Sequence, residues 1–280
     1  MTGVAVNGIR LAYRVSGEGD PVLLISGTGM SGAYWELLGA KVLRDAGYQV
    51  ITFDNRGVGD SDGPAGPYSV SEMAADTVGL LETLEISHVR VVGLSLGGAI
   101  AQQMAATRPD LIRAMVLWAS AGRTPAFFRR LLAVEGEMAA TMPLPESWHL
   151  WQYLLISLPF ASLQNDDALV EDVAELLADG IAWSGDGRAG QFGADVGWDT
   201  ADHAGLYSQF RCPCLVIAHE HDLIFPPAAG TAAAAAMPRG IVIEVPGVAH
   251  GQAMDAAAVA MRQIVEFFAS TDDGPSTASA

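Results

Sequence analysis

Short apolar runs separated by helical stretches are the feature that most constrains the fold of this chain. They are VLLI (22–25), YQVITF (48–53), VRVV (89–92), AMVLW (114–118), CLVIA (214–218) and IVIEV (241–245). A run of apolar residues fits a strand that is buried on both faces, and helices between such strands cover a parallel sheet. We therefore predict an α/β fold with a mostly parallel sheet that is covered on both sides.

A different strand pattern precedes this series. Residues 4–6 and 9–15 alternate between apolar and small or polar side chains on either side of Asn7-Gly8. Asn-Gly is typical of the type I′ turn, in which both central residues have positive φ. The sequence thus predicts an N-terminal antiparallel hairpin.

Two predicted helices between the strands have clear signals. Residues 34–46 place four apolar side chains on one helical stripe, namely Trp35, Leu38, Val42 and Ala46. A second helix is expected to begin after Ser69, because Ser69 and Glu72 have the spacing of a capping box.

The alternation of strands and helices breaks between residues 123 and 205, a segment rich in aromatic residues and methionine. We call this segment the helical insertion and expect it to form a lid over a pocket. The predicted organisation is a first core part (1–122), the helical insertion (123–205), a second core part (206–270) and a disordered tail (271–280). We expect Gly29, Met30 and Trp151 to line the pocket.

The charge balance restricts the partners of the chain. Acidic residues outnumber basic ones 32 to 15, which gives a formal charge of −17. A phosphate backbone or an anionic bilayer would repel such a surface, so we expect a small-molecule substrate and neither nucleic acid nor membrane. The sequence leaves a homodimer open.

Features of targeting and redox chemistry favour a cytoplasmic location. The N-terminus MTGVAVNGIR lacks the basic start and apolar core of a signal peptide, and no uncharged apolar run of about 18 residues follows. Cys212 and Cys214 are the two cysteines, too few for a disulfide scaffold or a structural zinc site. We expect reduced thiols.

A glycine pattern near the N-terminus suggests a first functional hypothesis. Gly27, Gly29 and Gly32 form G-x-G-x-x-G directly after an apolar run, and Asp54 follows 22 positions after the last glycine. This is the spacing of a dinucleotide site. A hairpin precedes the strand, however, and the cofactor hypothesis leaves a second glycine motif without a role. We therefore expect no cofactor.

The second motif is Gly93-Leu94-Ser95-Leu96-Gly97, which matches G-x-S-x-G between a predicted strand and a predicted helix. So tight a turn strains the backbone of the serine, and small residues two positions before and after it avoid a clash. The turn would lift the Ser95 hydroxyl above the sheet.

A serine hydroxyl needs a base to become a nucleophile. His250 follows the last predicted strand and Asp222 follows the strand before it, so both lie at the carboxyl ends of strands, on the side of Ser95. A carboxylate there could orient the imidazole. A metal site at His219-Glu220-His221-Asp222 lacks a further His or Cys cluster to complete it, and we expect no metal.

These stretches together resemble the α/β-hydrolase family, from about residue 3 to residue 269. The matching segments, in the order of the family, are FDNRGVGDSD (53–62), GLSLGG (93–98), HEHDLIFPP (219–227) and PGVAH (246–250). GQFGADVGWDTADHAG (190–205) is similar to the end of the lid in lactonase- and methylesterase-like members.

The resemblance implies roles for particular residues. Ser95 would be the nucleophile, His250 the general base and acid, and Asp222 the residue that orients it. The oxyanion hole would use the backbone N–H groups of Thr28 and Leu96. Many relatives have His-Gly at the start of the first loop, where this chain has Ser26-Gly27.

Two functional hypotheses follow. The first is a serine hydrolase that cleaves an ester, lactone or thioester of a mostly apolar, medium-sized substrate through an acyl-Ser95 intermediate. Arg123 or Arg129 could then bind one substrate carboxylate. The second is a non-hydrolytic role, namely C–C bond cleavage, cofactor-free oxygen or peroxide chemistry, cyclisation or ligand binding alone.

Overall fold

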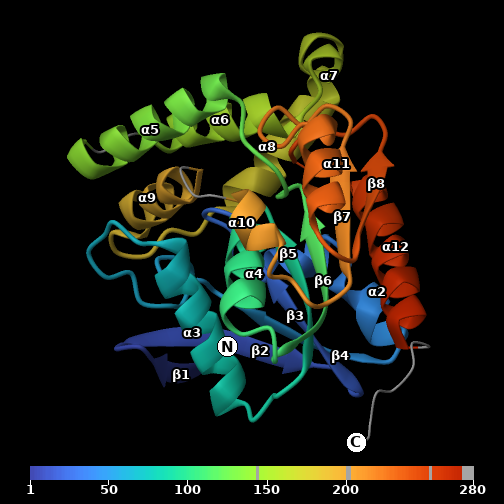
Figure 1. Ribbon diagram of the computed structural model, residues 1–280. Helices are drawn as coiled ribbons and strands as arrows, with labels where there is room; N and C mark the ends of the chain where they lie inside the picture. The colour runs from blue at the N-terminus through green and yellow to red at the C-terminus, as the bar shows by residue number, and fades with distance from the viewer. Residues whose placement is uncertain (143–144, 200–202, 252–253, 273–280) are drawn as a thin grey trace, which may run out of the picture.

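The computed structural model describes residues 1–142, 145–199, 203–251 and 254–272. Its strands are β1 (Thr2–Val6), β2 (Ile9–Ser16), β3 (Asp20–Ile25), β4 (Tyr48–Phe53), β5 (Val89–Leu94), β6 (Ile112–Trp118), β7 (Cys214–His219) and β8 (Gly240–Val245). They form one sheet in the order β1-β2-β4-β3-β5-β6-β7-β8, and neighbouring strands from β4 to β8 are parallel. The predicted mostly parallel sheet is confirmed (Figure 1).

The N-terminal hairpin is also confirmed. Strands β1 and β2 pair antiparallel around Asn7 and Gly8, whose φ angles are 46° and 79°. Positive φ at both positions is what a type I′ turn requires. Strand β2 then pairs antiparallel with β4, so the hairpin extends one edge of the sheet.

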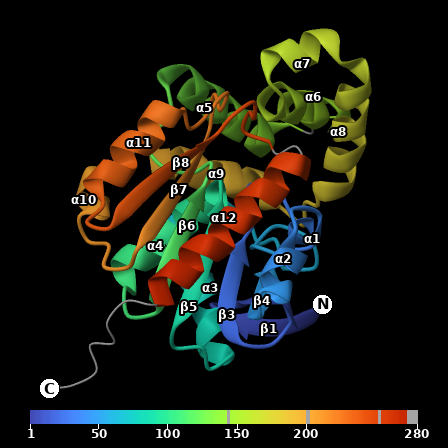
Figure 2. The same cartoon turned by 90° about the vertical axis from the view of Figure 1, so that its right-hand side faces the viewer.

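Helices cover both faces of the sheet. They are α1 (Tyr34–Leu37), α2 (Ala40–Asp45), α3 (Val70–Thr83), α4 (Leu96–Thr107), α5 (Ala126–Thr141), α6 (Glu146–Ser157), α7 (Phe160–Asn165), α8 (Asp167–Gly180), α9 (Gly187–Asp199), α10 (His203–Tyr207), α11 (Pro227–Ala236) and α12 (Met254–Asp272). Side chains of β3 alternate between two cores: Leu23 packs with α3 and α4, whereas Val22 and Leu24 pack with α2 and α12. Figures 1 and 2 show the helices on the two sides of the sheet.

The predicted helix over residues 34–46 is wrong as a single element. Gly39 has φ 98°, a left-handed conformation that ends α1 and precedes α2. The break turns the second half of the segment, so that Ala40 and Leu43 are buried in place of Val42 and Ala46. By contrast, the capping box of Ser69 and Glu72 at the start of α3 is present as predicted.

Strand β8 is less buried than its apolar sequence suggests. It lies at the edge of the sheet, where Ile241 is 53% exposed and Val242 is 37% exposed. An edge strand has a neighbouring strand on one side only, which leaves it less covered than the central strands.

The helical insertion forms helices α5 to α9 above the carboxyl ends of the parallel strands (Figure 1). It is joined to the core by two isolated β-bridges, Met30 with Ile181 and Val58 with Trp183. The next helix, α10, packs on α4 and α11 of the core.

The predicted disordered tail (271–280) lies outside the described residues from position 273 onward, and Thr271 and Asp272 belong to α12. Cys212 and Cys214 are buried free thiols. Within the described part of the chain, no helix has both the length and the apolar character needed to cross a membrane.

Candidate active site

Ser95 occupies a strained turn between β5 and α4. Its φ and ψ are 52° and −120°, a conformation that non-glycine residues adopt only when the surrounding structure imposes it. A Cβ atom at Gly97 would lie 2.0 Å from the carbonyl oxygen of Ile25, and one at Gly93 would lie 2.4 Å from the carbonyl oxygen of Gly97. The glycine spacing of the motif is therefore a steric requirement of the turn.

A chain of hydrogen bonds links the three polar residues that the sequence singled out. His250 Nε2 lies 3.0 Å from Ser95 Oγ, and His250 Nδ1 lies 2.9 Å from Asp222 Oδ2. Ser95 follows β5, Asp222 follows β7 and His250 follows β8, so strands far apart in the sequence bring them together. An imidazole held in this way can take a proton from the serine hydroxyl.

The Asp222 carboxylate is fixed on both of its oxygens. Its Oδ2 contacts His250, and its Oδ1 accepts hydrogen bonds from the N–H groups of Ile224 (2.8 Å) and Phe225 (2.9 Å). Burial alone would raise the pKa of Asp222, but His250 and these hydrogen bonds outweigh burial and lower the pKa. The group is thus ionised at neutral pH and favours the His250 tautomer with its proton on Nδ1.

His219 supports the loop that carries His250. Its Nε2 accepts a hydrogen bond from Trp118 Nε1 at 2.8 Å, so its Nδ1 carries the proton and donates to the Ala249 carbonyl at 2.7 Å. Burial lowers the pKa of His219 to about 4, which keeps the ring neutral. With both nitrogens engaged, His219 is not available as a metal ligand. The described residues contain no group of three His, Cys, Asp or Glu suited to a metal ion.

The loop after β3, residues 26–32, faces Ser95. A Cβ atom at Gly27 would lie 3.2 Å from Ser95 Cβ, so the backbone comes close to the serine. Asp54, the residue at the position of a ribose ligand, accepts hydrogen bonds from the N–H groups of Gly32 (2.7 Å) and Asp60 (2.9 Å). Both of its oxygens hold the protein's own backbone, which accounts for Asp54 without a dinucleotide.

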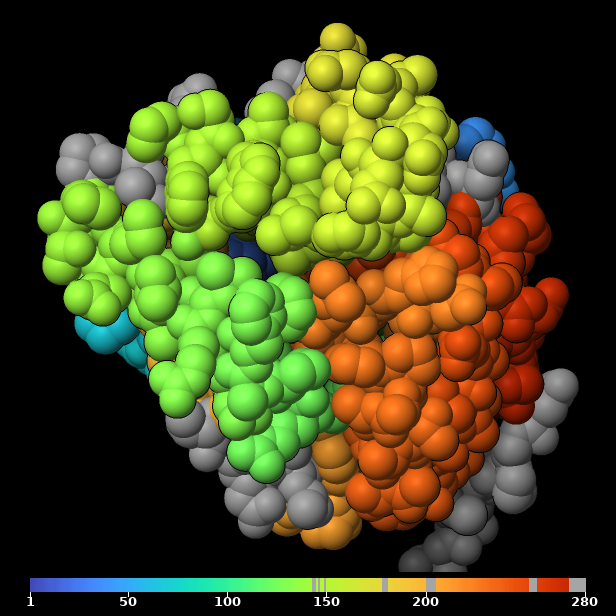
Figure 3. Space-filling view, turned by 90° about the horizontal axis from the view of Figure 1, so that it is seen from above, coloured from blue at the N-terminus to red at the C-terminus, as the bar shows by residue number. Residues whose placement is uncertain are grey.

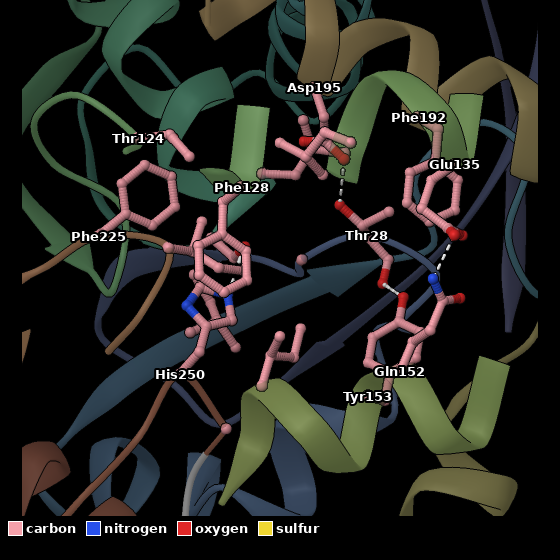
Figure 4. Close-up of a pocket in the computed structure, with 18 of the residues that line it drawn as sticks. Thr28, Thr124, Phe128, Glu135, Gln152, Tyr153, Phe192, Asp195, Phe225 and His250 are labelled. Atoms are coloured by element: carbon pink, nitrogen blue, oxygen red, sulfur yellow. Dashed lines mark hydrogen bonds between the residues drawn. The ribbon is translucent and has the colours of Figure 1, made fainter. Parts of the chain in front are cut away.

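The helical insertion holds Thr28 and the following peptide bond through three side chains, which we call the Thr28 clamp: Tyr153, Gln191 and Asp195. Tyr153 donates its hydroxyl to the Thr28 carbonyl at 2.8 Å, and Thr28 Oγ1 donates to Asp195 Oδ2 at 2.8 Å. Gln191 Oε1 accepts the N–H of Gly29 at 2.9 Å. Tyr153 and Asp195 approach Thr28 from opposite sides (Figure 4).

The family follows from this geometry and from comparison with known proteins. A family model described as "alpha/beta hydrolase fold" matches residues 20–257. The chain belongs to the α/β-hydrolase family.

Individual relatives of the chain differ in their described activities. The "Putative non-heme bromoperoxidase BpoC" of Mycobacterium tuberculosis H37Rv is 33% identical over 263 residues, which cover 94% of this chain and 98% of that protein. Its crystal structure is similar with a TM-score of 0.85, at 32% identity over 93% of this chain and 96% of that chain. The "Putative carbamate hydrolase RutD" of Azorhizobium caulinodans is 27% identical, over 86% of this chain and 88% of that protein.

A structure of an enol-lactonase from Burkholderia xenovorans LB400 is also similar. Its TM-score is 0.80, with 25% identity over 96% of this chain and 100% of that chain. These relatives establish the fold, and their names describe different reactions.

In this α/β-hydrolase, the insertion also reaches the histidine. The N–H of His250 donates to the carbonyl of Ile156 in α6 at 3.0 Å. Helix α6 therefore contacts both sides of the site, Thr28 through Tyr153 and His250 through Ile156.

A pocket lies between the helical insertion and the carboxyl ends of the strands. Ser95, His250, Thr28 and Leu96 all line it. Most of the other lining side chains are apolar, among them Phe128, Leu131, Leu132, Phe192, Ile224 and Phe225. Seen from above, the surface is hollowed within the insertion, and atoms of the N-terminal part of the chain are visible at the bottom (Figure 3).

The predictions about the pocket wall have different outcomes. Met30 lines the pocket, whereas Gly29 is not among the lining residues and bonds to Gln191 through its N–H. Trp151 is 55% exposed and stacks on Trp148 at 5.5 Å, outside the pocket. Because successive residues of a helix are rotated by about 100°, the face of α6 that turns Tyr153 inward turns Trp151 outward.

Several site residues carry no signal in the sequence. Tyr153, Gln191 and Asp195 lie in the insertion, and no motif or spacing relates them to Thr28. Asn55 donates to the Ser26 carbonyl at 3.1 Å and so steadies the loop from the core side. Only the folded structure shows that these residues converge on one loop.

Proposed function

We propose that this protein is a serine hydrolase that cleaves a carboxylic ester, lactone or thioester through an acyl-Ser95 intermediate. The observation that carries the proposal is the hydrogen-bonded chain of Ser95, His250 and Asp222, with heavy-atom distances of 3.0 and 2.9 Å, beside an apolar pocket. In this proposal the three residues form a catalytic triad.

In the first half of the reaction, Ser95 Oγ attacks the substrate carbonyl carbon while His250 Nε2 takes the hydroxyl proton. The carbonyl oxygen becomes an oxyanion that the N–H groups of Thr28 and Leu96 stabilise. Leu96 is the first residue of α4, and the first N–H groups of a helix have no partner within the helix. Collapse of the oxyanion breaks the bond to the leaving group, which receives the proton from His250.

In the second half, His250 takes a proton from a water molecule, which attacks the acyl carbon. The Ser95–acyl bond breaks, the proton on His250 returns to Ser95 Oγ, and the carboxylic acid leaves. Asp222 stabilises the imidazolium form of His250 in both halves without itself accepting the proton. The apolar wall favours a mostly apolar substrate of medium size.

A fluorophosphonate probe tests the activated serine directly. We expect the wild type to be labelled at Ser95 and the Ser95→Ala variant to remain unlabelled. A series of nitrophenyl esters of increasing chain length then tests hydrolysis. Labelling of Ser95→Ala to the wild-type level, or ester turnover no higher than that of the variant, would refute the proposal.

One observation favours a second candidate, because a relative with 33% identity carries the name of a bromoperoxidase. In this alternative, hydrogen peroxide replaces water as the acceptor, and acyl-Ser95 yields a peracid. Incubating the protein with an acetate ester and hydrogen peroxide, and measuring peracid, distinguishes the two. Peracid formation that depends on Ser95 would support the alternative; free acid alone would contradict it.

A further inference from the structure

The described part of the pocket wall carries carboxyl groups but neither lysine nor arginine. Glu135, Asp195 and Asp199 line it, and none of the described lining residues is lysine or arginine. The site is therefore unlike one built to hold a carboxylate, for which a guanidinium or ammonium group is the usual partner.

Two of these three carboxyl groups are paired with arginines. Arg188 Nη2 lies 3.6 Å from Glu135 Oε2, and Arg129 Nε lies 3.5 Å from Asp199 Oδ2. The pairing of Arg129 also leaves it unsuited to the substrate carboxylate that the sequence suggested it could bind. Arg123, the other candidate, is exposed and is not among the lining residues.

Asp195 is the carboxyl group without a cation. Within the described chain its hydrogen-bond partner is Thr28, whose hydroxyl donates to Oδ2 at 2.8 Å, and no arginine or lysine lies within ion-pair distance. Its other oxygen, Oδ1, makes no hydrogen bond to the described residues, and the side chain lines the pocket. An acceptor is thus left open toward the substrate.

The position of Asp195 places its carboxyl group beside the proposed oxyanion hole. The residue lies on α9 and contacts the side chain of Thr28, whose backbone N–H belongs to the proposed oxyanion hole. Figure 4 shows the Asp195 carboxyl beside Thr28, with His250 across the pocket. A substituent within a few atoms of the scissile carbonyl would meet Asp195.

We propose that Asp195 selects the substrate by charge: it accepts acyl groups that carry an amine or hydroxyl donor near the carbonyl and excludes acyl groups that carry a carboxylate. The inference rests on the proposed ester hydrolysis and names its substrate class. An ammonium or hydroxyl group satisfies the open oxygen, whereas a carboxylate brings a second negative charge into a poorly solvated pocket.

The ionisation of Asp195 gives the selection a pH dependence. Burial raises the pKa of Asp195 to about 7, despite the opposing effects of the Thr28 hydrogen bond and of His250. The other titratable or charged groups around it are Asp199 on its own helix, Tyr153 on α6, and Glu135 and Arg188 beyond Tyr153. Exclusion of a carboxylate should therefore strengthen as the pH rises from about 6 to 8.

Nitrophenyl esters of matched length test the proposal: butyrate, 3-hydroxypropanoate, 3-aminopropanoate and hydrogen succinate. The measurement is kcat/KM for each ester relative to butyrate, in the wild type and in Asp195→Asn, which keeps an acceptor for Thr28. Glu137→Gln is the control, because it removes the same charge from an exposed position of the helical insertion.

We expect the succinate-to-butyrate ratio to rise about tenfold in Asp195→Asn, which corresponds to about 1.4 kcal/mol, and the aminopropanoate-to-butyrate ratio to fall by a similar factor. Both ratios should stay within twofold of the wild type in Glu137→Gln. In the wild type the succinate ratio should fall as the pH rises through 7, and this dependence should vanish in Asp195→Asn. Effects of pH that are common to both esters cancel in the ratio.

Unchanged ratios in Asp195→Asn together with a flat pH dependence in the wild type would overturn the charge selection alone, provided that butyrate is hydrolysed faster by the wild type than by Ser95→Ala. Hydrolysis of butyrate no faster than by Ser95→Ala would overturn the proposed function and the selection with it. The wild-type pH series stands without any variant, so a folding defect in Asp195→Asn does not decide the outcome.

Discussion

Replacing Tyr153 with phenylalanine removes one atom from the Thr28 clamp. The Tyr153 hydroxyl donates to the Thr28 carbonyl at 2.8 Å, and burial raises the pKa of Tyr153, so the group stays protonated and able to donate. The same peptide unit is held on its other side by Gln191, which accepts the N–H of Gly29. Without the hydroxyl, the Thr28–Gly29 peptide is held from one side only.

The structure sets the size of the expected effect. Loss of one intramolecular hydrogen bond costs about 0.5–1.5 kcal/mol of stability, and removal of a whole oxyanion-hole donor costs about 2.7–4 kcal/mol of transition-state stabilisation. Tyr153→Phe leaves the Thr28 N–H in place but loosens its orientation. We therefore expect a loss of about 1–2 kcal/mol in the transition state, seen as a kcat about 5- to 30-fold lower.

Steady-state hydrolysis of nitrophenyl butyrate, together with thermal unfolding, tests this expectation. Tyr68→Phe is the matched control, because the Tyr68 hydroxyl also donates to a backbone carbonyl, that of Pro64, at 2.7 Å, and Tyr68 is not a lining residue of the pocket. Both variants should lose similar stability, but only Tyr153→Phe should lose kcat, with KM changing less than threefold. Equal kcat in the two variants would refute the positioning role of Tyr153.

Two further predictions concern the core around the site. Gly97→Ala would place a Cβ atom 2.0 Å from the Ile25 carbonyl oxygen, so we expect thermal unfolding to show a free energy of unfolding lower by about 1–3 kcal/mol or more. A Cβ atom at Gly197 would meet nothing within 4 Å, so the control variant Gly197→Ala should retain full stability. Equal melting temperatures of the two variants would contradict the argument. His219 has its pKa lowered to about 4 by burial, so on acidification the unfolded chain binds a proton before the folded chain does, and stability present above about pH 6.5 is lost toward pH 4. Urea unfolding should show a decrease of about 3 kcal/mol over this range in the wild type and a smaller one in His219→Gln, whereas identical pH slopes would exclude the role of His219.

The sequence predicts the catalytic candidates because their signals are local. The G-x-S-x-G spacing around Ser95 is required by a single turn, and His250 and Asp222 each follow an apolar strand directly. Parallel strands present their carboxyl ends at one edge of the sheet, so residues after different strands meet there. No knowledge of the remaining packing is needed for this inference.

The walls of the pocket could not be predicted in the same way. Which face of α6 points inward depends on how the helical insertion docks on the core, and the sequence pattern does not fix this for Tyr153 or Trp151. Likewise, Gly39 interrupts a regular apolar stripe because its φ of 98° redirects the chain, an effect that periodicity alone does not reveal. Gly27 brings backbone close to Ser95, whereas Gly29 packs against Trp183 and Gly32 against the backbone of Phe53. The spacing of these glycines alone does not distinguish such contacts from a phosphate site.

The hydrogen bonds from the helical insertion to the Thr28–Gly29 peptide limit how the insertion can be replaced in this fold. Tyr153 in α6 holds the carbonyl of the Thr28–Gly29 peptide and Gln191 in α9 holds its N–H, while Ile156 in α6 holds the backbone of His250. An insertion transplanted from a relative would replace the pocket wall and these three anchors together. Recombination of such segments should therefore alter substrate range and turnover jointly, unless the anchoring residues are transferred as a matched set.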